Sequence, residues 1–125
     1  MKLRIRGDSI RLRLTRGEVA QLVSSGQVAE HTHLPAGAGF RYELRTDAGA
    51  RAIGATFDAG VLGILVPKAA AEAWAHSEEV GISAQVPLAE GALAVLVEKD
   101  YPCLTVRAGE DDSDAFARDR LRVER

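Results

Sequence analysis

The chain has 125 residues, of which 46% are hydrophobic and 27% are charged, and its formal net charge is −2. A chain of this length forms one domain with a substantial core, and no apolar run approaches the roughly 18 residues that a membrane span requires. The single cysteine, Cys103, excludes an internal disulfide framework and zinc sites built from several cysteines. We therefore expect a soluble cytoplasmic protein, and the near-neutral charge gives no general reason to expect nucleic acid binding.

The N-terminal residues have the alternation that is typical of a half-buried β-hairpin. In residues 2–6 and 10–14, leucine and isoleucine alternate with lysine and arginine. Between them, Gly7-Asp8-Ser9 has the composition of a turn. These segments predict two antiparallel strands.

A helix is predicted directly after this hairpin. Thr15 and Glu18 have the spacing of a capping box, in which each side chain accepts a hydrogen bond from the other residue's amide. Apolar residues follow at helical spacing within 19–23, and Gly26 is suited to end the helix. Strands are then expected at 27–34 and 39–46, on either side of a turn at 35–37.

The second half of the chain repeats this order. A strand at about 51–57, a turn at 58–60 and a strand at 61–66 lead to Pro67, which is expected at the first position of a second helix. Strands at about 79–86 and 91–99 complete the series.

An ungapped shift of 52 residues places core positions, helix starts and turns of one half on those of the other. It pairs Leu12 with Ile64, Leu22 with Trp74, Val28 with Val80 and Leu44 with Leu96. We interpret residues 1–49 and 50–100 as ββαββ pseudo-repeats. The predicted fold is α+β, with about eight mostly antiparallel strands and two helices in one domain, residues 1–106, arranged as a bent sheet or a partly closed barrel.

The two predicted repeats differ on the face opposite the core. The shift places Gly63, Leu65, Leu93, Val95 and Val97 where the first half has charged residues. The segments 61–66 and 92–97 are therefore apolar on both faces, and such strands need cover on both sides. Either the C-terminal segment or a second subunit of a homodimer would supply that cover.

Residues 107–125 are expected to form an acidic C-terminal tail, either as a short helix or without order. The acidic run at 110–114 lacks the ligand spacing and the glycine of a calcium-binding loop. Residues 98–114 hold six acids and two bases, whereas residues 1–16 hold six bases and one acid. The two ends of the chain therefore carry opposite charge.

Three patterns suggest catalysis or metal binding. Residues 7–10, Gly-Asp-Ser-Ile, are similar to the opening motif of GDS-type hydrolases, but the chain has no asparagine for their oxyanion hole, and a hairpin turn explains the motif. His31 and His33 are two apart on a predicted strand, so both rings lie on one face and are candidate metal ligands, with Cys103 or the acidic run as a third. Alternatively, they are part of a solvated face. Cys103 itself is more typical of a buried small residue than of a nucleophile.

The densest charge in the chain lies on one face of the predicted N-terminal hairpin. This face carries Lys2, Arg4, Arg6, Arg11 and Arg13. Like charges on facing strands repel each other unless an anion relieves them. The face is therefore a candidate site for an anionic ligand or for the acidic tail, and the alternative is a solvated surface.

Residues 2–15, 97–104 and 110–116 resemble a family of small, uncharacterised bacterial proteins that consist of this domain alone. The resemblance implies a compact bacterial protein and assigns no catalytic residue or cofactor. The sequence thus favours a non-enzymatic binding module that uses its basic hairpin and acidic tail. The alternative is a metal-binding protein or metalloenzyme with ligands at His31 and His33.

Overall fold

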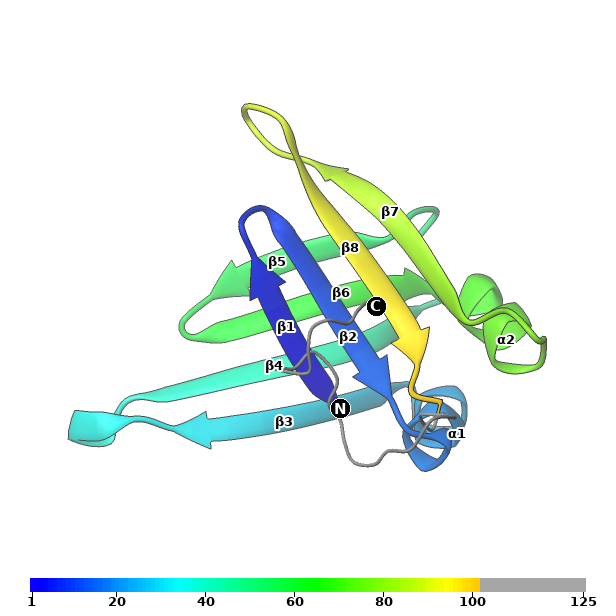
Figure 1. The fold of residues 1–125 in the computed structure, drawn as a ribbon, viewed down its shortest axis with the longest axis horizontal. Helices are drawn as coiled ribbons and strands as arrows, with labels where there is room; N and C mark the ends of the chain where they lie inside the picture. Colours follow the sequence, from blue (N-terminus) through cyan, green and yellow to red (C-terminus); the bar gives the residue numbers. More distant parts are fainter. Residues whose placement is uncertain (102–125) are drawn as a thin grey trace, which may run out of the picture.

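The computed structural model describes residues 1–101, so the predicted tail at 107–125 and Cys103 lie outside the described residues. The described part has eight strands, two α-helices and a short 3-10 helix at Pro35–Gly37 (Figure 1). In chain order the elements are β1 (Lys2–Arg6), β2 (Ser9–Leu14), α1 (Arg16–Ser25), β3 (Gln27–His33), β4 (Gly39–Asp47), β5 (Gly54–Asp58), β6 (Val61–Pro67), α2 (Lys68–Ala75), β7 (Gly81–Pro87) and β8 (Ala92–Lys99).

The strands form two four-stranded sheets, and not a closed barrel. Sheet A has the order β1-β2-β8-β7, and sheet B has the order β3-β4-β6-β5. Each sheet therefore takes one antiparallel hairpin from each half of the chain and joins the two hairpins by a central parallel pair, β2–β8 or β4–β6. The predicted α+β class, with eight mostly antiparallel strands and two helices, is confirmed.

The pairing of strands corrects the ungapped shift of 52 residues. The shift holds for the first hairpin of each half, β1–β2 and β5–β6. Leu3 pairs with Leu12, and the residues 52 positions later, Ala55 and Ile64, pair with each other. It fails for the second hairpin of each half, β3–β4 and β7–β8. There the pair Val28 and Leu44 corresponds to the pair Ile82 and Val97, which lie 54 and 53 residues later. Five residues connect α2 to β7, whereas Gly26 alone connects α1 to β3. Val80, the expected partner of Val28, consequently lies in this connection and is exposed.

This change of register also corrects the predicted outer face of β8. A slip of one residue moves every side chain of a strand to the opposite face. Val95 and Val97, expected on the outer face, are buried in the core. Ala94 and Leu96 alternate with them and lie on the outer face of sheet A.

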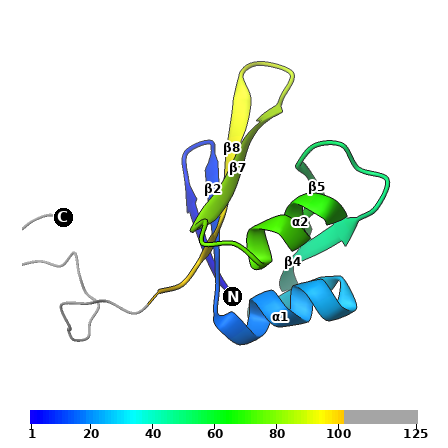
Figure 2. The same cartoon turned by 90° about the vertical axis from the view of Figure 1, so that its right-hand side faces the viewer.

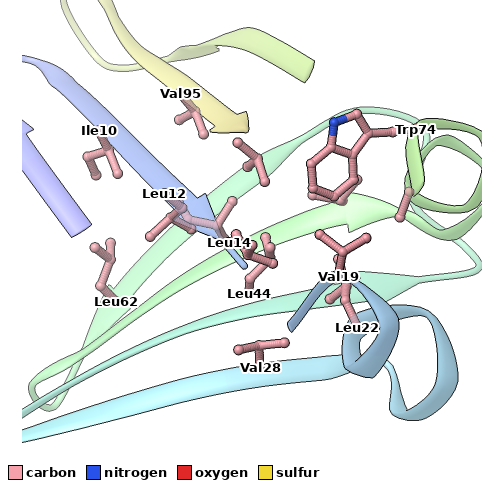
Figure 3. Packing of buried hydrophobic residues seen from close by; sticks show 14 residues of the cluster. Ile10, Leu12, Leu14, Val19, Leu22, Val28, Leu44, Leu62, Trp74 and Val95 are labelled. Atoms are coloured by element: carbon pink, nitrogen blue, oxygen red, sulfur yellow. The ribbon is translucent and has the colours of Figure 1, made fainter. Parts of the chain in front are cut away.

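The core lies between the inner faces of the two sheets, and the helices close it on one side (Figures 2 and 3). Residues of β2, β6 and β8 meet there, as do Val19 and Leu22 of α1. Trp74 of α2 is fully buried, and its indole N–H donates to the Val80 carbonyl at 3.1 Å. The buried hydrophobic residues are Ile10, Leu12, Leu14, Val19, Leu22, Val28, Leu44, Leu62, Ile64, Val66, Ala71, Trp74, Val95 and Val97.

Local signals explain where α1 begins and ends. Thr15 Oγ1 accepts from the Glu18 amide, and Glu18 Oε1 accepts from the Thr15 amide at 2.9 Å, which is the predicted capping box. Gly26 ends the helix with a φ of 84°. Pro67 departs from expectation, because it is the last residue of β6 and caps α2, which begins at Lys68. Within residues 1–101, neither helix is long and apolar enough to cross a membrane.

Candidate anion-binding surface

The outer face of sheet A is the face turned away from the core. Along β2, Ile10, Leu12 and Leu14 point inward and are buried, so Arg11 and Arg13 point outward. The outward residues of β1 lie directly opposite them: Arg4 faces Arg11, and Lys2 faces Arg13. We call the outward set the basic face; its members are Lys2, Arg4, Arg6, Arg11 and Arg13.

Glu98 of β8 balances only part of this charge. Its Oε2 accepts from Arg13 Nε at 3.0 Å and Nη2 at 2.8 Å, and Arg11 Nε is 3.6 Å away. The Glu98 side chain is only 14% exposed, and the ladder places it beside Arg13. The single Glu98 carboxylate therefore balances the charge of only one of the two arginines, Arg11 and Arg13, which leaves a surplus of positive charge on β2.

Arg4 and Arg6 provide the largest unbalanced charge of the basic face. Both are exposed, and neither forms an ion pair or a side-chain hydrogen bond within the part of the chain that the structure describes. Arg4 directly opposes Arg11, and like charges in that position repel each other. An anion placed over these two strands would relieve that repulsion.

An apolar strip borders the basic face on the side of β8. Leu96 pairs with Arg11, and Ala94 pairs with Ser9, and both side chains are partly exposed. Beyond them, Ser83 and Gln85 of β7 face Leu96 and Ala94 across the ladder. The outer face of sheet A thus changes from cationic to apolar to neutral polar across its width.

The chain leaves the sheet beside the basic face. The Asp100 amide donates to the Leu14 carbonyl at 2.8 Å, and the Asp100 carboxylate lies 3.4 Å from Lys2 Nζ. Lys2 is 74% exposed, so this ion pair is of the weak, solvated kind. It nevertheless shows that Asp100, the first residue after β8, lies next to the cations.

The N-terminal ammonium group anchors β1 to the rest of the molecule. It pairs with Glu18 of α1 and, at 3.0 Å, with Glu30 of β3, while the Tyr42 hydroxyl donates to the Met1 carbonyl at 3.0 Å. This contact joins sheet A, α1 and sheet B through one residue. No sequence pattern signalled it, because Glu18 is already explained as half of a capping box.

The contact shifts three pKa values. Burial alone would lower the pKa of the Met1 ammonium, but hydrogen bonds and charge from Glu18 and Glu30 leave it above its ordinary value. Burial would raise the pKa of Glu18, but the ammonium and the capping hydrogen bonds leave it below the ordinary value. Burial and the two nearby carboxylates raise the pKa of Tyr42. The Met1 ammonium and the Glu18 carboxylate are therefore both charged at neutral pH.

The outer face of sheet B has a different charge balance. Arg41 and Arg45 both approach Glu43, with Nε to carboxylate distances of 3.1 and 3.3 Å. Asp47 and Asp58 lie at the ends of β4 and β5 on the same face. The charges of sheet B largely cancel, so the surplus of positive charge is a property of sheet A.

His31 and His33 lie on this outer face of sheet B, away from the basic face. As predicted, they share one side of β3, and their ring centroids are 4.5 Å apart. Among residues 1–101, no cluster of three or more histidine, cysteine or acidic side chains is arranged to hold a metal ion. Cys103, the third ligand suggested by the sequence, lies outside the described residues.

Ser9 is the first residue of β2, directly after the β1–β2 turn. Gly7 adopts a φ of 54° in the β1–β2 turn, and Ser9 Oγ donates to the Arg6 carbonyl at 3.0 Å. This hydrogen bond closes the hairpin, which is the explanation that the sequence favoured.

Comparison with known proteins gives a family without an assigned activity. Residues 1–120 match the family of unknown function DUF7009. Neither the curated proteins nor the solved structures contain a match to this chain. Because the family match covers almost the entire sequence, the chain belongs to the DUF7009 family of unknown function.

Proposed function

We propose that the protein is a non-enzymatic binding module whose basic face binds an acidic polypeptide segment. The observation that carries the proposal is the presence of five cations on one face, of which Arg4 and Arg6 have no anionic partner within residues 1–101. Solubility alone does not explain why Arg4 lies opposite Arg11, since this arrangement lowers the stability of the folded protein.

The geometry favours carboxylates on an extended chain. Alternate residues of a β-strand are about 6.6 Å apart and share one face, so every second side chain of an extended peptide can meet successive cations of β1 and β2. The planar guanidinium group binds a carboxylate through two parallel hydrogen bonds. The strip formed by Ala94 and Leu96 further suits an apolar side chain of the same peptide.

Two other anions fit this face less well. Single-stranded nucleic acid is bound by aromatic side chains that stack on its bases, and no residue of the basic face or its apolar border is aromatic. A free phosphate ion would not use the apolar strip.

The test uses a fluorescein-labelled peptide of four glutamate-threonine repeats that ends in phenylalanine. Its anisotropy is titrated with the full-length protein and with the variant Arg4→Gln/Arg6→Gln. We expect the double substitution to weaken binding about tenfold or more, since each charge-assisted hydrogen bond contributes on the order of 1.5 kcal/mol. The peptide with glutamine in place of glutamate should not bind.

The control variant is Arg16→Gln/Arg51→Gln, which removes the same charge from exposed positions outside the basic face. It should change the dissociation constant less than twofold at physiological salt. Equal weakening in both variants would show that only net charge matters and would contradict the proposal. So would the absence of binding both to the wild-type protein and to a variant in which Glu110, Asp112 and Asp114 are neutralised.

A metal site at His31 and His33 is a second candidate, because their rings lie close together on an exposed strand face. A third ligand would come from Cys103 or from the acidic residues 110–114. We expect calorimetric titration with Zn²⁺ to give one site that the variant His31→Ala/His33→Ala loses and His76→Gln retains. Unchanged Zn²⁺ binding by the double variant would contradict this candidate.

A further inference from the structure

We infer that the acidic segment formed by residues 110–116 of this chain binds the basic face of the same molecule, and that an external acidic partner must displace it. The inference rests on the proposed function of the basic face and names its resident ligand. It makes the protein a self-inhibited binding module.

The segment has the chemistry that the face requires. In an extended chain, residues 110, 112, 114 and 116 share one side. These residues are Glu110, Asp112, Asp114 and Phe116, so this side carries three carboxylates followed by one aromatic ring. The basic face and its border have the same two parts, with cations on β1 and β2 and the apolar residues Ala94 and Leu96 on β8.

The segment is also within reach. Asp100 lies beside Lys2 at one end of the basic face, and Arg6 is level with Ala94, five residues back along β8 from Lys99. At about 3.3 Å per residue, these five residues correspond to about 17 Å. The eight residues 102–109 span up to about 28 Å when extended, so the connection is long enough for the segment to fold back over the cations.

Because the acidic segment is covalently connected to the basic face, it competes for this site at a higher effective concentration than the segment of a second copy of the chain does. A ligand held by a short flexible linker has an effective concentration in the millimolar range. At micromolar protein, a second copy of the chain is present at a concentration about a thousandfold lower than this. The segment therefore occupies its own molecule in preference to a partner molecule.

The test compares three full-length proteins with the labelled glutamate-threonine peptide. One is wild type, and the second is Glu110→Gln/Asp112→Asn/Asp114→Asn. The third, Glu78→Gln/Glu79→Gln/Asp119→Asn, removes the same charge elsewhere in the chain. A tail at an effective concentration of about 1 mM, with an intrinsic dissociation constant of about 0.25 mM, weakens peptide binding by a factor of one plus their ratio, which is about five. Its removal should therefore tighten peptide binding about fivefold, whereas the control should change it less than twofold.

The outcomes separate the inference from the proposed function. If the wild type binds the peptide and the tail variant binds it equally well, the basic face is a binding site but the tail does not occupy it. If no protein binds the peptide, both statements are wrong. Sedimentation velocity at 100 μM provides a further check: a dimer that dissociates in the tail variant would show that the segment binds a second copy, and would overturn the intramolecular inference.

Discussion

In the Glu110→Gln/Asp112→Asn/Asp114→Asn background, where the acidic segment no longer neutralises the basic face, replacing Arg4 with threonine should make the protein more stable and a weaker binder. Arg4 opposes Arg11 directly on the neighbouring strand, and of the two only Arg11 has a carboxylate of residues 1–101 nearby, Glu98 at 3.6 Å. For unit charges about 6 Å apart, Coulomb's law in water gives roughly 0.7 kcal/mol before screening. Salt at physiological strength removes about half of it. Arg4→Thr should therefore raise the free energy of unfolding by about 0.4 kcal/mol.

Arg13→Thr is the matched comparison, because it lies on the same face and removes the same charge. Arg13 donates to Glu98 at 3.0 and 2.8 Å, and Glu98 is largely buried. Loss of this ion pair should lower the free energy of unfolding by about 0.5–1 kcal/mol. The two substitutions should thus have opposite effects on stability, although both weaken binding of the acidic peptide.

Urea denaturation followed by circular dichroism measures both changes. In 1 M NaCl the stabilisation by Arg4→Thr should largely disappear, since the screening length falls to about 3 Å. A gain that persists at high salt would reflect the strand preference of threonine and not relief of repulsion. A loss of stability in Arg4→Thr in this background would refute the reasoning, because it would show that Arg4 has a stabilising partner other than the acidic segment.

Three further predictions concern the fold. Acetylation of the Met1 amine should lower the thermal unfolding temperature near neutral pH, because Glu18 and Glu30 lose their cation. The pKa of Glu18 lies below its ordinary value and that of the ammonium above it, so the stabilisation by this pair should fade as pH drops below about 4.5 or rises above about 8. A difference in unfolding temperature that does not depend on pH would contradict this prediction. Gly60→Ala should lower the free energy of unfolding, measured by urea denaturation, by about 1–2 kcal/mol, because φ is +79° and the added Cβ would lie 3.0 Å from the Gly39 carbonyl oxygen. At Gly17 an added Cβ meets no atom within 4 Å, so Gly17→Ala should not lower the free energy of unfolding. Trp74→Ala should cost about 3–5 kcal/mol by calorimetry or denaturation, because it empties a fully buried site.

Local chemistry made much of this fold predictable. The alternation in β1 and β2, the capping box at Thr15 and the glycine at position 26 each depend on residues close in sequence, and the structure contains all three. The placement of five cations on one face followed from the same alternation. Such features need no knowledge of which strands become neighbours.

The arrangement of the sheets depends on contacts between distant residues, which the sequence alone did not specify. An ungapped shift could not detect that the connection from α2 to β7 is longer, and this length decides which face of β8 is buried. The same limit applies to Glu98, whose role beside Arg13 requires β8 to pair with β2. The contact of Met1 with Glu18 and Glu30 likewise joins elements far apart in the chain.

The most direct test of the binding proposal is a methyl NMR titration of the full-length protein with the glutamate-threonine peptide. Leu96 and Leu65 are the outward-facing leucines of the central strands of sheets A and B, and both are partly exposed. We predict that the peptide shifts the methyl resonances of Leu96 and leaves those of Leu65 unchanged. Shifts at Leu65, or at neither residue under conditions where the peptide binds, would contradict the assignment of the binding site to the outer face of sheet A.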